Sequence, residues 1–290
     1  MELNFTLILA QVVAGLTRGM LYYLLASGLT LIFGVLGIIN FAHGTFYMFA
    51  VFLAISVTGL TNYWVALVIV PLVLAFAGGL CEVVLLRRIY KAEHLLQLLL
   101  TFALVFVGSD LVKILWGSYP LSLPRVDFLR GGMFLGGVRI STMYIFMVAV
   151  SAGCGLALWL MLYKTKWGTI IRACTIDKEM AEALGINVRI LFTIVFMIGS
   201  WLAGIGGVVA APLVGGVVGM DMDIIVLCFA VVVVGGMGSL RGALLGALII
   251  GLVESFGLLI LPQYAIAFAF GVMAMVLIFR PWGLLGTPSN

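Results

Sequence analysis

The chain has 290 residues, of which 64% are hydrophobic and 9% are charged, with a formal net charge of +4. Soluble domains carry about 25% charged residues, so this composition excludes a water-soluble globular protein. It predicts a single membrane-embedded domain over residues 1–290, built from many helices. The cationic residues are few and scattered, which argues against a nucleic-acid partner.

Nine apolar segments are expected to form membrane-embedded helices, so the predicted fold class is an all-α polytopic membrane protein. The segments are Leu7–Gly34, Thr45–Leu60, Trp64–Leu86, Leu95–Trp116, Ser141–Tyr163, Ile190–Leu213, Ile224–Met237, Ala243–Leu259 and Tyr264–Phe279. Some are shorter than the about 20 residues that cross a bilayer untilted. The two segments around Gly238 are expected to form either two short spans or one span with a broken or re-entrant half.

The first apolar segment leads into a break at Phe33–Gly44, with the sequence FGVLGIINFAHG. Irregular backbone at membrane depth persists only where it is buried in protein or lines a wet cavity. Broken helices near the midplane are typical of transport pathways. We therefore expect Asn40, Phe41 and His43 to lie along a translocation path. For Asn40 and His43 the alternative is a structural role in hydrogen bonding between helices.

A second glycine cluster also joins two apolar runs, in VVVVGGMGSLRGALLGALIIG at Val231–Gly251. Both glycine-rich segments contain a basic or imidazole group, which is His43 in Phe33–Gly44 and Arg241 in Val231–Gly251. Internal repeats of this kind are typical of transporters, although glycine-rich apolar stretches also resemble one another by chance. We expect Gly235 and Gly238 to line the same path.

The distribution of basic residues predicts which side of the membrane each loop faces. With nine spans, 10 of the 15 Lys and Arg residues fall on one side, in the loops at 87–91 and 164–189 and at Arg241 and Arg280. This side is predicted to be cytoplasmic, with the amino terminus outside. The outer segment at 116–141 is also basic and argues against this orientation.

The polar stretch at 164–189 is expected to contain a short amphipathic helix. Asp177 is placed to act as its N-cap, Glu179 complements the positive end of the helix dipole, and Gly185 fits the C′ position. Its apolar face consists of three residues at helical spacing, Met180, Ala183 and Leu184. Such a helix either docks into a groove of a partner or lies on the bilayer surface.

Acidic residues inside apolar segments are costly to bury and are therefore candidates for function. Glu254 either pairs with a basic residue such as Arg18 or takes part in proton coupling. Glu82 is expected to form an ion pair with Arg87 near the membrane interface.

Other acidic residues are expected nearer the ends of the helices. Asp110 and Lys113 are three residues apart, a spacing that permits an ion pair on a helix. Asp221 and Asp223 are predicted to lie in a solvated outer turn, and the alternative is contact with a basic patch on an external binding protein.

The sequence contains no Ser/His/Asp or Cys/His set at plausible spacing and no paired carboxylates for a cleft. Its four cysteines lack the spacing of a metal site or a disulfide framework. It also lacks the G-x-x-x-x-G-K-[ST] phosphate loop, so it does not bind ATP by that device. We therefore expect a transport subunit rather than an enzyme, with no catalytic, cofactor-binding or metal-binding residues. Its energy would come from a partner or from an ion gradient.

Four stretches resemble the permease subunits of branched-chain amino acid ABC importers of the LivH type. They are GLTRGMLYYLLASGLTLIFGVLGIINFAHG (Gly15–Gly44), YKTKWGTIIRACTIDKEMAEALGINV (Tyr163–Val188), VVVVGGMGSLRGALLGALIIG (Val231–Gly251) and RPWGLLG (Arg280–Gly286). The resemblance implies an ATP-driven, binding-protein-dependent importer of branched-chain or other hydrophobic amino acids in the bacterial cytoplasmic membrane. It also implies a lipid-embedded complex with a second related permease, two cytoplasmic ATPase subunits and an external solute-binding protein.

In the family that the chain resembles, the loop corresponding to Trp167–Asn187 meets the ATPase. The resemblance therefore implies a coupling role for seven residues of this loop, Arg172, Asp177, Glu179, Met180, Ala183, Leu184 and Gly185.

The substrate and the energy source stay open at this point. Relatives of this type also carry urea, short amides or aromatic acids, and Arg18, Tyr22 and Tyr23 depart from the usual pattern. The alternative from another class is a self-sufficient proton-coupled carrier or channel, with His43 and Glu254 as coupling groups.

Overall fold

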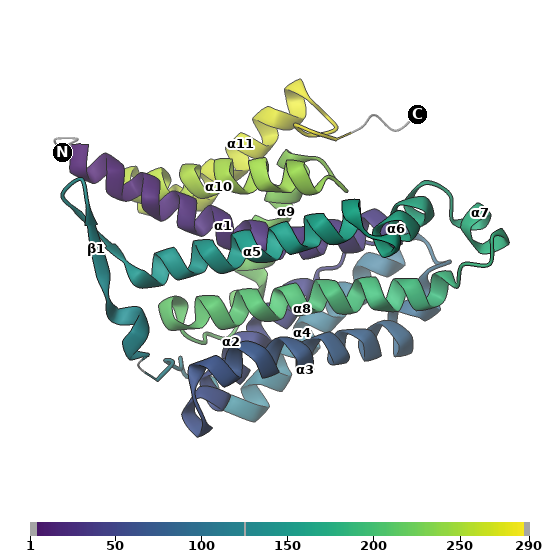
Figure 1. Cartoon of the computed structure of the whole chain (residues 1–290), viewed down its shortest axis with the longest axis horizontal. Helices are drawn as coiled ribbons and strands as arrows, with labels where there is room; N and C mark the ends of the chain where they lie inside the picture. Colours follow the sequence, from purple (N-terminus) through teal and green to yellow (C-terminus); the bar gives the residue numbers. More distant parts are fainter. Residues whose placement is uncertain (1–4, 125, 287–290) are drawn as a thin grey trace. The chain divides into compact units, whose positions relative to one another are not determined.

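The computed structural model describes residues 5–124 and 126–286, which form eleven α-helices and one β-hairpin (Figure 1). The helices are α1 (Phe5–Leu36), α2 (Ala42–Leu60), α3 (Tyr63–Val84), α4 (His94–Trp116), α5 (Thr142–Lys164), α6 (Lys166–Ile176), α7 (Lys178–Ala183), α8 (Val188–Val214), α9 (Met220–Gly235), α10 (Leu240–Ile260) and α11 (Ala265–Phe279). Three 3₁₀ turns are η1 (Leu86–Ile89), η2 (Asp127–Arg130) and η3 (Pro262–Tyr264), and the hairpin strands are β1 (Gly132–Leu135) and β2 (Val138–Ser141).

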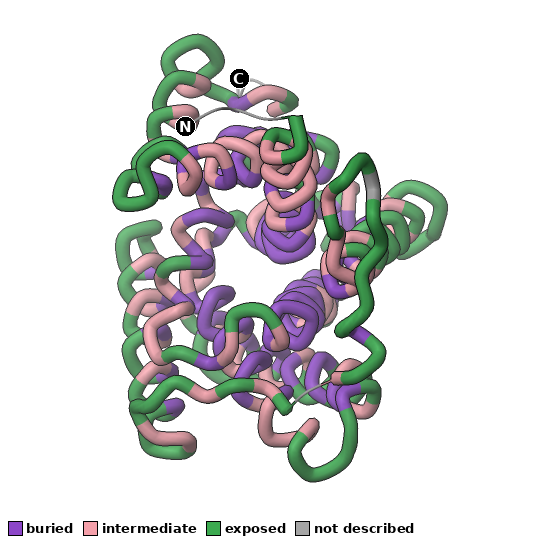
Figure 2. The backbone as a smooth tube through the Cα atoms, turned by 90° about the vertical axis from the view of Figure 1, so that its left-hand side faces the viewer, coloured by how far each residue is buried: buried purple, intermediate pink, exposed green. Residues whose placement is uncertain are grey.

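The predicted all-α polytopic fold is confirmed. In the described part of the chain, eight helices are long and apolar enough to cross a membrane. The seventh predicted segment, Ile224–Met237, corresponds to α9, which has 16 residues. At 1.5 Å per residue it is about 24 Å long, whereas the hydrocarbon core of a bilayer is about 30 Å thick. Many helical turns are exposed although their side chains are apolar, as expected for surfaces that meet lipid or other subunits (Figure 2).

Within the predicted single domain, the chain forms two compact units. Unit 1 comprises Met1–Ala26, Arg125–Gly153 and Val226–Asn290, and unit 2 comprises Ser27–Pro124 and Cys154–Ile225.

Unit 2 is built around α8, which packs against α2 and α3, while α4 packs against α2. The close approach of α8 to α2 depends on Gly207. A Cβ atom at this position would lie 2.6 Å from the carbonyl oxygen of Tyr47. Small residues allow helix backbones to approach in this way in membranes, where packing rather than hydrophobic burial drives association.

Unit 1 contains a comparable contact between α1 and α10. A Cβ atom at Gly251 would lie 2.4 Å from the backbone nitrogen of Gly19 and 2.5 Å from the carbonyl oxygen of Gly15. Ser255, one turn further along α10, donates a hydrogen bond of 2.9 Å to the Gln11 carbonyl oxygen. The glycine contact therefore fixes how closely these two helices approach.

The Gly251 contact predicts a large difference between two otherwise similar substitutions. Gly251→Val is expected to destabilise the protein by about 1–3 kcal/mol, because the side chain would overpack the α1–α10 contact. Gly271→Val is the matched control, since an added Cβ there has no atom within 4 Å. Thermal unfolding in detergent measures the effect. Equal unfolding midpoints for the two variants would contradict the proposed packing.

Candidate functional site

The predicted break after the first helix is present and lies in unit 2. Helix α1 ends at Leu36, Gly37 has a φ of +73° in the left-handed region, and α2 begins at Ala42. Asn40 is 1% exposed, and its amide nitrogen and oxygen lack hydrogen-bond partners among the residues that the structure describes. The segment therefore buries polar atoms next to helix ends, which carry backbone groups without intrahelical partners.

The other two predicted path residues of this break are held by different contacts. His43 is 1% exposed, and its ring lies against Gly28, where an added Cβ would be 3.0 Å from the His43 Cε1 atom. Phe41 makes an edge-to-face contact with Phe102 of α4, with 5.1 Å between ring centroids. His43 is thus packed tightly, in keeping with the structural alternative, whereas a role for these residues along a path stays a prediction.

Gly235 and Gly238, the other predicted path residues, lie at the joint between α9 and α10 in unit 1. Gly238 has a φ of +81°, and Ser239 caps α10 by accepting a hydrogen bond from the Gly242 nitrogen. The backbone N–H of Leu285 donates to the Gly235 carbonyl oxygen at 3.0 Å. The RPWGLLG segment therefore packs onto this joint, a contact that the sequence alone does not indicate.

The inner loop forms two helices, α6 and α7, with the caps that the sequence predicts. Asp177 Oδ1 accepts a hydrogen bond of 2.9 Å from the Met180 nitrogen, as an N-cap should. Gly185 has a φ of +85° just after α7 ends, which fits the C′ position. These local predictions are confirmed.

The predicted apolar face of α7 is largely uncovered in this chain. Met180 is 57% exposed and Leu184 is 75% exposed, while Ala183 is also exposed. Ala181, which lies beside this face, is buried and anchors the helix. Two polar residues of the predicted coupling set differ in their contacts. Glu179 is exposed, whereas the Arg172 guanidinium lies over the Tyr163 ring and donates to the Leu162 carbonyl.

Lys178 connects α7 to two membrane helices, a contact that sequence reasoning missed. Its Nζ donates a hydrogen bond of 3.4 Å to the carbonyl oxygen of Leu36, the last residue of α1. The same ammonium group lies 5.3 Å from the centroid of the Phe192 ring in α8. A cation at the carbonyl end of a helix is favourable, so Lys178 ties the inner loop to the end of α1, directly before the break.

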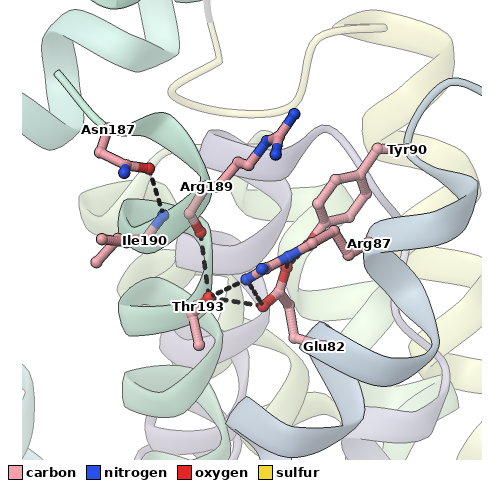
Figure 3. Close-up of polar contacts among 7 residues, drawn as sticks. All are labelled: Glu82, Arg87, Tyr90, Asn187, Arg189, Ile190 and Thr193. Carbon is pink, nitrogen blue, oxygen red and sulfur yellow. Dashed lines mark hydrogen bonds and ion pairs between the residues drawn. The ribbon is translucent and has the colours of Figure 1, made fainter. Parts of the chain in front are cut away.

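A buried carboxylate, Glu82, joins the end of α3 to α8 (Figure 3). Glu82 is fully buried, and its Oε2 lies 3.0 Å from Arg87 Nη2, which confirms the predicted ion pair. Tyr90 donates to Oε1 at 2.6 Å and Thr193 donates to Oε2 at 2.7 Å. Burial and the hydrogen bond to Glu82 raise the pKa of the Tyr90 hydroxyl above its ordinary value, so it remains a neutral donor. The Tyr90 ring also contacts Phe192 edge to face, with 5.4 Å between centroids.

Two further predicted ion pairs are present. In unit 1, Arg18 Nη1 lies 3.9 Å from Glu254 Oε1, and Glu254 Oε2 accepts a hydrogen bond of 2.5 Å from the Tyr22 hydroxyl. In unit 2, Lys113 Nζ lies 2.9 Å from Asp110 Oδ1. The structural pairing of Glu254 is therefore confirmed.

The prediction that Asp221 lies in a solvated turn is wrong. Asp221 is fully buried in the first turn of α9, and its Oδ2 accepts hydrogen bonds from Thr45 at 3.3 Å and from Ser109 at 3.1 Å. The physical reason is that α9 begins at Met220 and its first turn packs closely on α2. A Cβ at Gly44 would lie 2.4 Å from the Asp221 carbonyl oxygen. Asp223 is exposed, as predicted.

Comparison with known proteins adds independent findings. The family model described as "Branched-chain amino acid transport system / permease component" matches residues 11–279. The chain is 33% identical over 300 residues to the high-affinity branched-chain amino acid transport system permease protein BraD of Pseudomonas aeruginosa, covering 97% of this chain and 96% of that protein. It is 30% identical over 313 residues to the corresponding permease protein LivH of Escherichia coli (strain K12), covering 100% of this chain and 99% of that protein.

Among solved structures, the chain is similar to PsaBC from Streptococcus pneumoniae in complex with Fab. The TM-score is 0.48 and the sequence identity is 13%, over 92% of this chain and 91% of that chain.

Proposed function

Because this chain belongs to the family of branched-chain amino acid transport permeases, we propose that it is the membrane subunit of an ATP-driven, binding-protein-dependent importer of branched-chain or other hydrophobic amino acids. It is a multi-pass protein of the bacterial cytoplasmic membrane and a transport subunit. The observation that carries the finer proposal is the exposed apolar face of the capped helix α7. An amphipathic helix with this exposure suits docking into a groove of a partner.

The proposed complex contains this chain, a second related permease, two cytoplasmic ATPase subunits and an external solute-binding protein. Met180, Ala183 and Leu184 would supply the apolar contact with an ATPase subunit. Asp177 and Gly185 would hold the helix in shape, since they cap its two ends. Glu179 and Arg172 complete the proposed coupling set. Glu179 is exposed at the surface, whereas Arg172 holds the loop by its contacts with Tyr163 and Leu162.

Movement of α7 would reach the membrane helices through two sets of contacts in unit 2. Lys178 contacts both the end of α1 and the Phe192 ring of α8. Phe192 in turn contacts Tyr90, which is hydrogen bonded to Glu82 of α3. We propose that ATP binding and hydrolysis in the partner subunits shift α7, and that these contacts pass the shift to α1, α3 and α8.

The translocation path would run past the α1–α2 break, where Asn40 offers polar atoms that have no partner in the described chain. Phe41 and His43 belong to the same proposed path, as do Gly235 and Gly238 at the α9–α10 joint. A protein-lined path is where irregular backbone is tolerated at membrane depth.

Reconstitution of the purified components tests the proposed function. Proteoliposomes that contain both permeases, the ATPases and the binding protein are expected to accumulate leucine only when ATP is supplied. Omission of the ATPases or the binding protein should reduce uptake to background. A panel with urea, short amides and aromatic acids tests substrate class. Uptake by this chain alone, driven by a proton gradient, would contradict the proposal and favour a secondary carrier.

A further inference from the structure

Helix α1 carries a charged residue, Arg18, within its membrane span. The helix has 32 residues, so it is about 48 Å long. Arg18 lies about 20 Å from the end at Phe5 and about 27 Å from the end at Leu36. The hydrocarbon core of a bilayer is about 30 Å thick. Wherever that core lies along α1, it therefore includes Arg18.

Arg18 forms a loose ion pair with Glu254 of α10. Arg18 Nη1 lies 3.9 Å from Glu254 Oε1, which is longer than a hydrogen bond. Tyr22, one turn further along α1, donates a hydrogen bond of 2.5 Å to Oε2 of the same carboxylate. All three residues belong to unit 1. Tyr22 therefore holds the carboxylate in place, whereas the guanidinium is attracted to it by charge alone.

Part of the Arg18 side chain lies at the surface of this chain. The side chain of Arg18 is 41% exposed and that of Glu254 is 13% exposed. Because Nη1 is enclosed by protein, the exposed part of Arg18 belongs to its other atoms. A guanidinium carries five N–H donors, and the described part of the chain contains no hydrogen bond from Arg18. Charged side chains within membrane helices face protein or a water-filled cavity rather than lipid. The exposed edge of Arg18 therefore requires a polar partner that this chain does not supply.

We propose that Arg18 and Glu254 together bind the charged head of the transported amino acid. The exposed edge of the guanidinium would donate hydrogen bonds to the α-carboxylate of the solute, in the two-pronged geometry that arginine favours. Glu254 Oε1, which takes no part in the Tyr22 hydrogen bond, would accept from the ammonium group. This assignment rests on the proposed function and names the residues that would recognise the solute.

The balance of charges favours a solute over a permanent partner. An amino acid at neutral pH has one charge of each sign, and so does the Arg18–Glu254 pair. Solute binding therefore adds no net charge within the hydrocarbon layer, where unbalanced charge is costly. A permanent carboxylate from a second permease would instead leave an unbalanced negative charge beside Glu254.

Uptake by the complete reconstituted complex tests the assignment with a double variant that keeps the cluster neutral. Arg18→Gln combined with Glu254→Gln removes both charges, while an amide oxygen at position 254 can still accept from Tyr22. If the pair only joins α1 to α10, this variant should transport normally, because uncharged groups often replace an embedded ion pair without loss of stability. We expect it to assemble and to hydrolyse ATP, but to transport leucine roughly tenfold to 100-fold more slowly, since hydrogen bonds to charged groups are lost.

Two further variants calibrate this result. Arg18→Lys keeps the charge but lacks the planar fork of arginine, so its rate should lie between those of the unmodified complex and the double variant. The matched control is Asp110→Asn combined with Lys113→Gln, which removes an exposed ion pair of α4. This control should transport at the normal rate. Leucine binding by the separate binding protein should not change in any of these experiments.

A labelling measurement covers the case in which the double variant does not assemble. Arg18→Cys and Leu16→Cys are compared in membranes that contain the complex, with a charged maleimide that does not enter lipid. Leu16 lies two residues earlier on α1 and is 38% exposed, so it is an apolar position that suits contact with lipid. We expect Arg18→Cys to react and Leu16→Cys to react little, after subtraction of the labelling of the unmodified chain.

Two results would overturn the assignment. One is normal uptake by the assembled double variant, which would leave the pair as a structural link between α1 and α10. The other is labelling of Arg18→Cys no greater than that of Leu16→Cys, which would place Arg18 against lipid or a second permease. If the unmodified complex fails to accumulate leucine with ATP, the proposed function fails instead. Labelling of Arg18→Cys does not depend on uptake, so the two failures are distinguishable.

Discussion

Replacing Leu184 with Asp is expected to abolish ATP-driven uptake while leaving the protein folded in the membrane. Leu184 is 75% exposed in this chain, at the end of the apolar face that α7 presents. A carboxylate on this face costs the isolated chain little, because it stays in water. In a desolvated contact with an ATPase subunit it would be a buried charge without a partner, which is strongly unfavourable. The Leu184→Asp complex should therefore lose its ATPase subunits on purification.

The matched control is Leu60→Asp at the end of α2, where the leucine is 85% exposed. The predicted topology places Leu60 on the outer side, away from the ATPase, so this variant should keep its ATPase subunits. Co-purification and uptake are measured for both variants. If Leu184→Asp retains its ATPase and transports normally, α7 is not the coupling element.

Local features of this fold could be predicted from sequence because their causes lie within a few residues. Asp177 caps α7 through a nitrogen three residues away, and Gly185 ends the same helix through its own φ angle. The break after Leu36 is also local, because Gly37 adopts a positive φ angle there and the polar Asn40 interrupts the apolar run. Apolar runs likewise located the spans, because each segment must be long and apolar enough to cross the bilayer.

Contacts between distant segments could not be predicted in this way. Asp221 and Thr45 are 176 residues apart, and Lys178 and Leu36 are 142 residues apart. Between two glycine-flanked apolar runs, a short acidic stretch such as MDMD is typical of an exposed turn, and nothing local distinguishes Asp221 from Asp223. Their different environments arise because α9 begins with its first turn against α2 and α4, so that only the first of the two acids points into protein. Candidate site residues of this kind require the three-dimensional packing.

Glu82 is another case in which only part of the arrangement was predictable. The five-residue spacing to Arg87 indicated an ion pair, but the sequence gives no sign of Thr193, which is 111 residues away and ties the carboxylate to α8. With Tyr90 as a third donor, the carboxylate receives hydrogen bonds from Arg87 in η1, from Tyr90 directly after η1 and from Thr193 in α8 (Figure 3). The cluster therefore fastens the first turns of α8, which follow the inner loop, to the end of α3.

We expect Glu82→Ala to destabilise the protein by about 3 kcal/mol, because loss of one member of a buried ion pair leaves its partners without their acceptor. The value lies at the lower end of the usual range, since the Arg87 side chain is 32% exposed and can turn toward water. The matched control is Asp110→Ala, whose pair with Lys113 has side chains that are 68% and 47% exposed. Exposed pairs of this kind contribute about 0–1 kcal/mol.

Thermal unfolding of the two variants in detergent measures the difference, and ATP-driven uptake at a temperature where both are folded tests its consequence. If the cluster transmits movement between α7 and α3, folded Glu82→Ala should hydrolyse ATP with less solute transported per ATP, whereas Asp110→Ala should keep the normal ratio. Glu82→Gln separates charge from hydrogen bonding, because its amide oxygen can still accept from Tyr90 or Thr193 but no longer neutralises Arg87. A normal unfolding midpoint and a normal transport ratio in Glu82→Ala would show that neither stability nor coupling depends on this carboxylate.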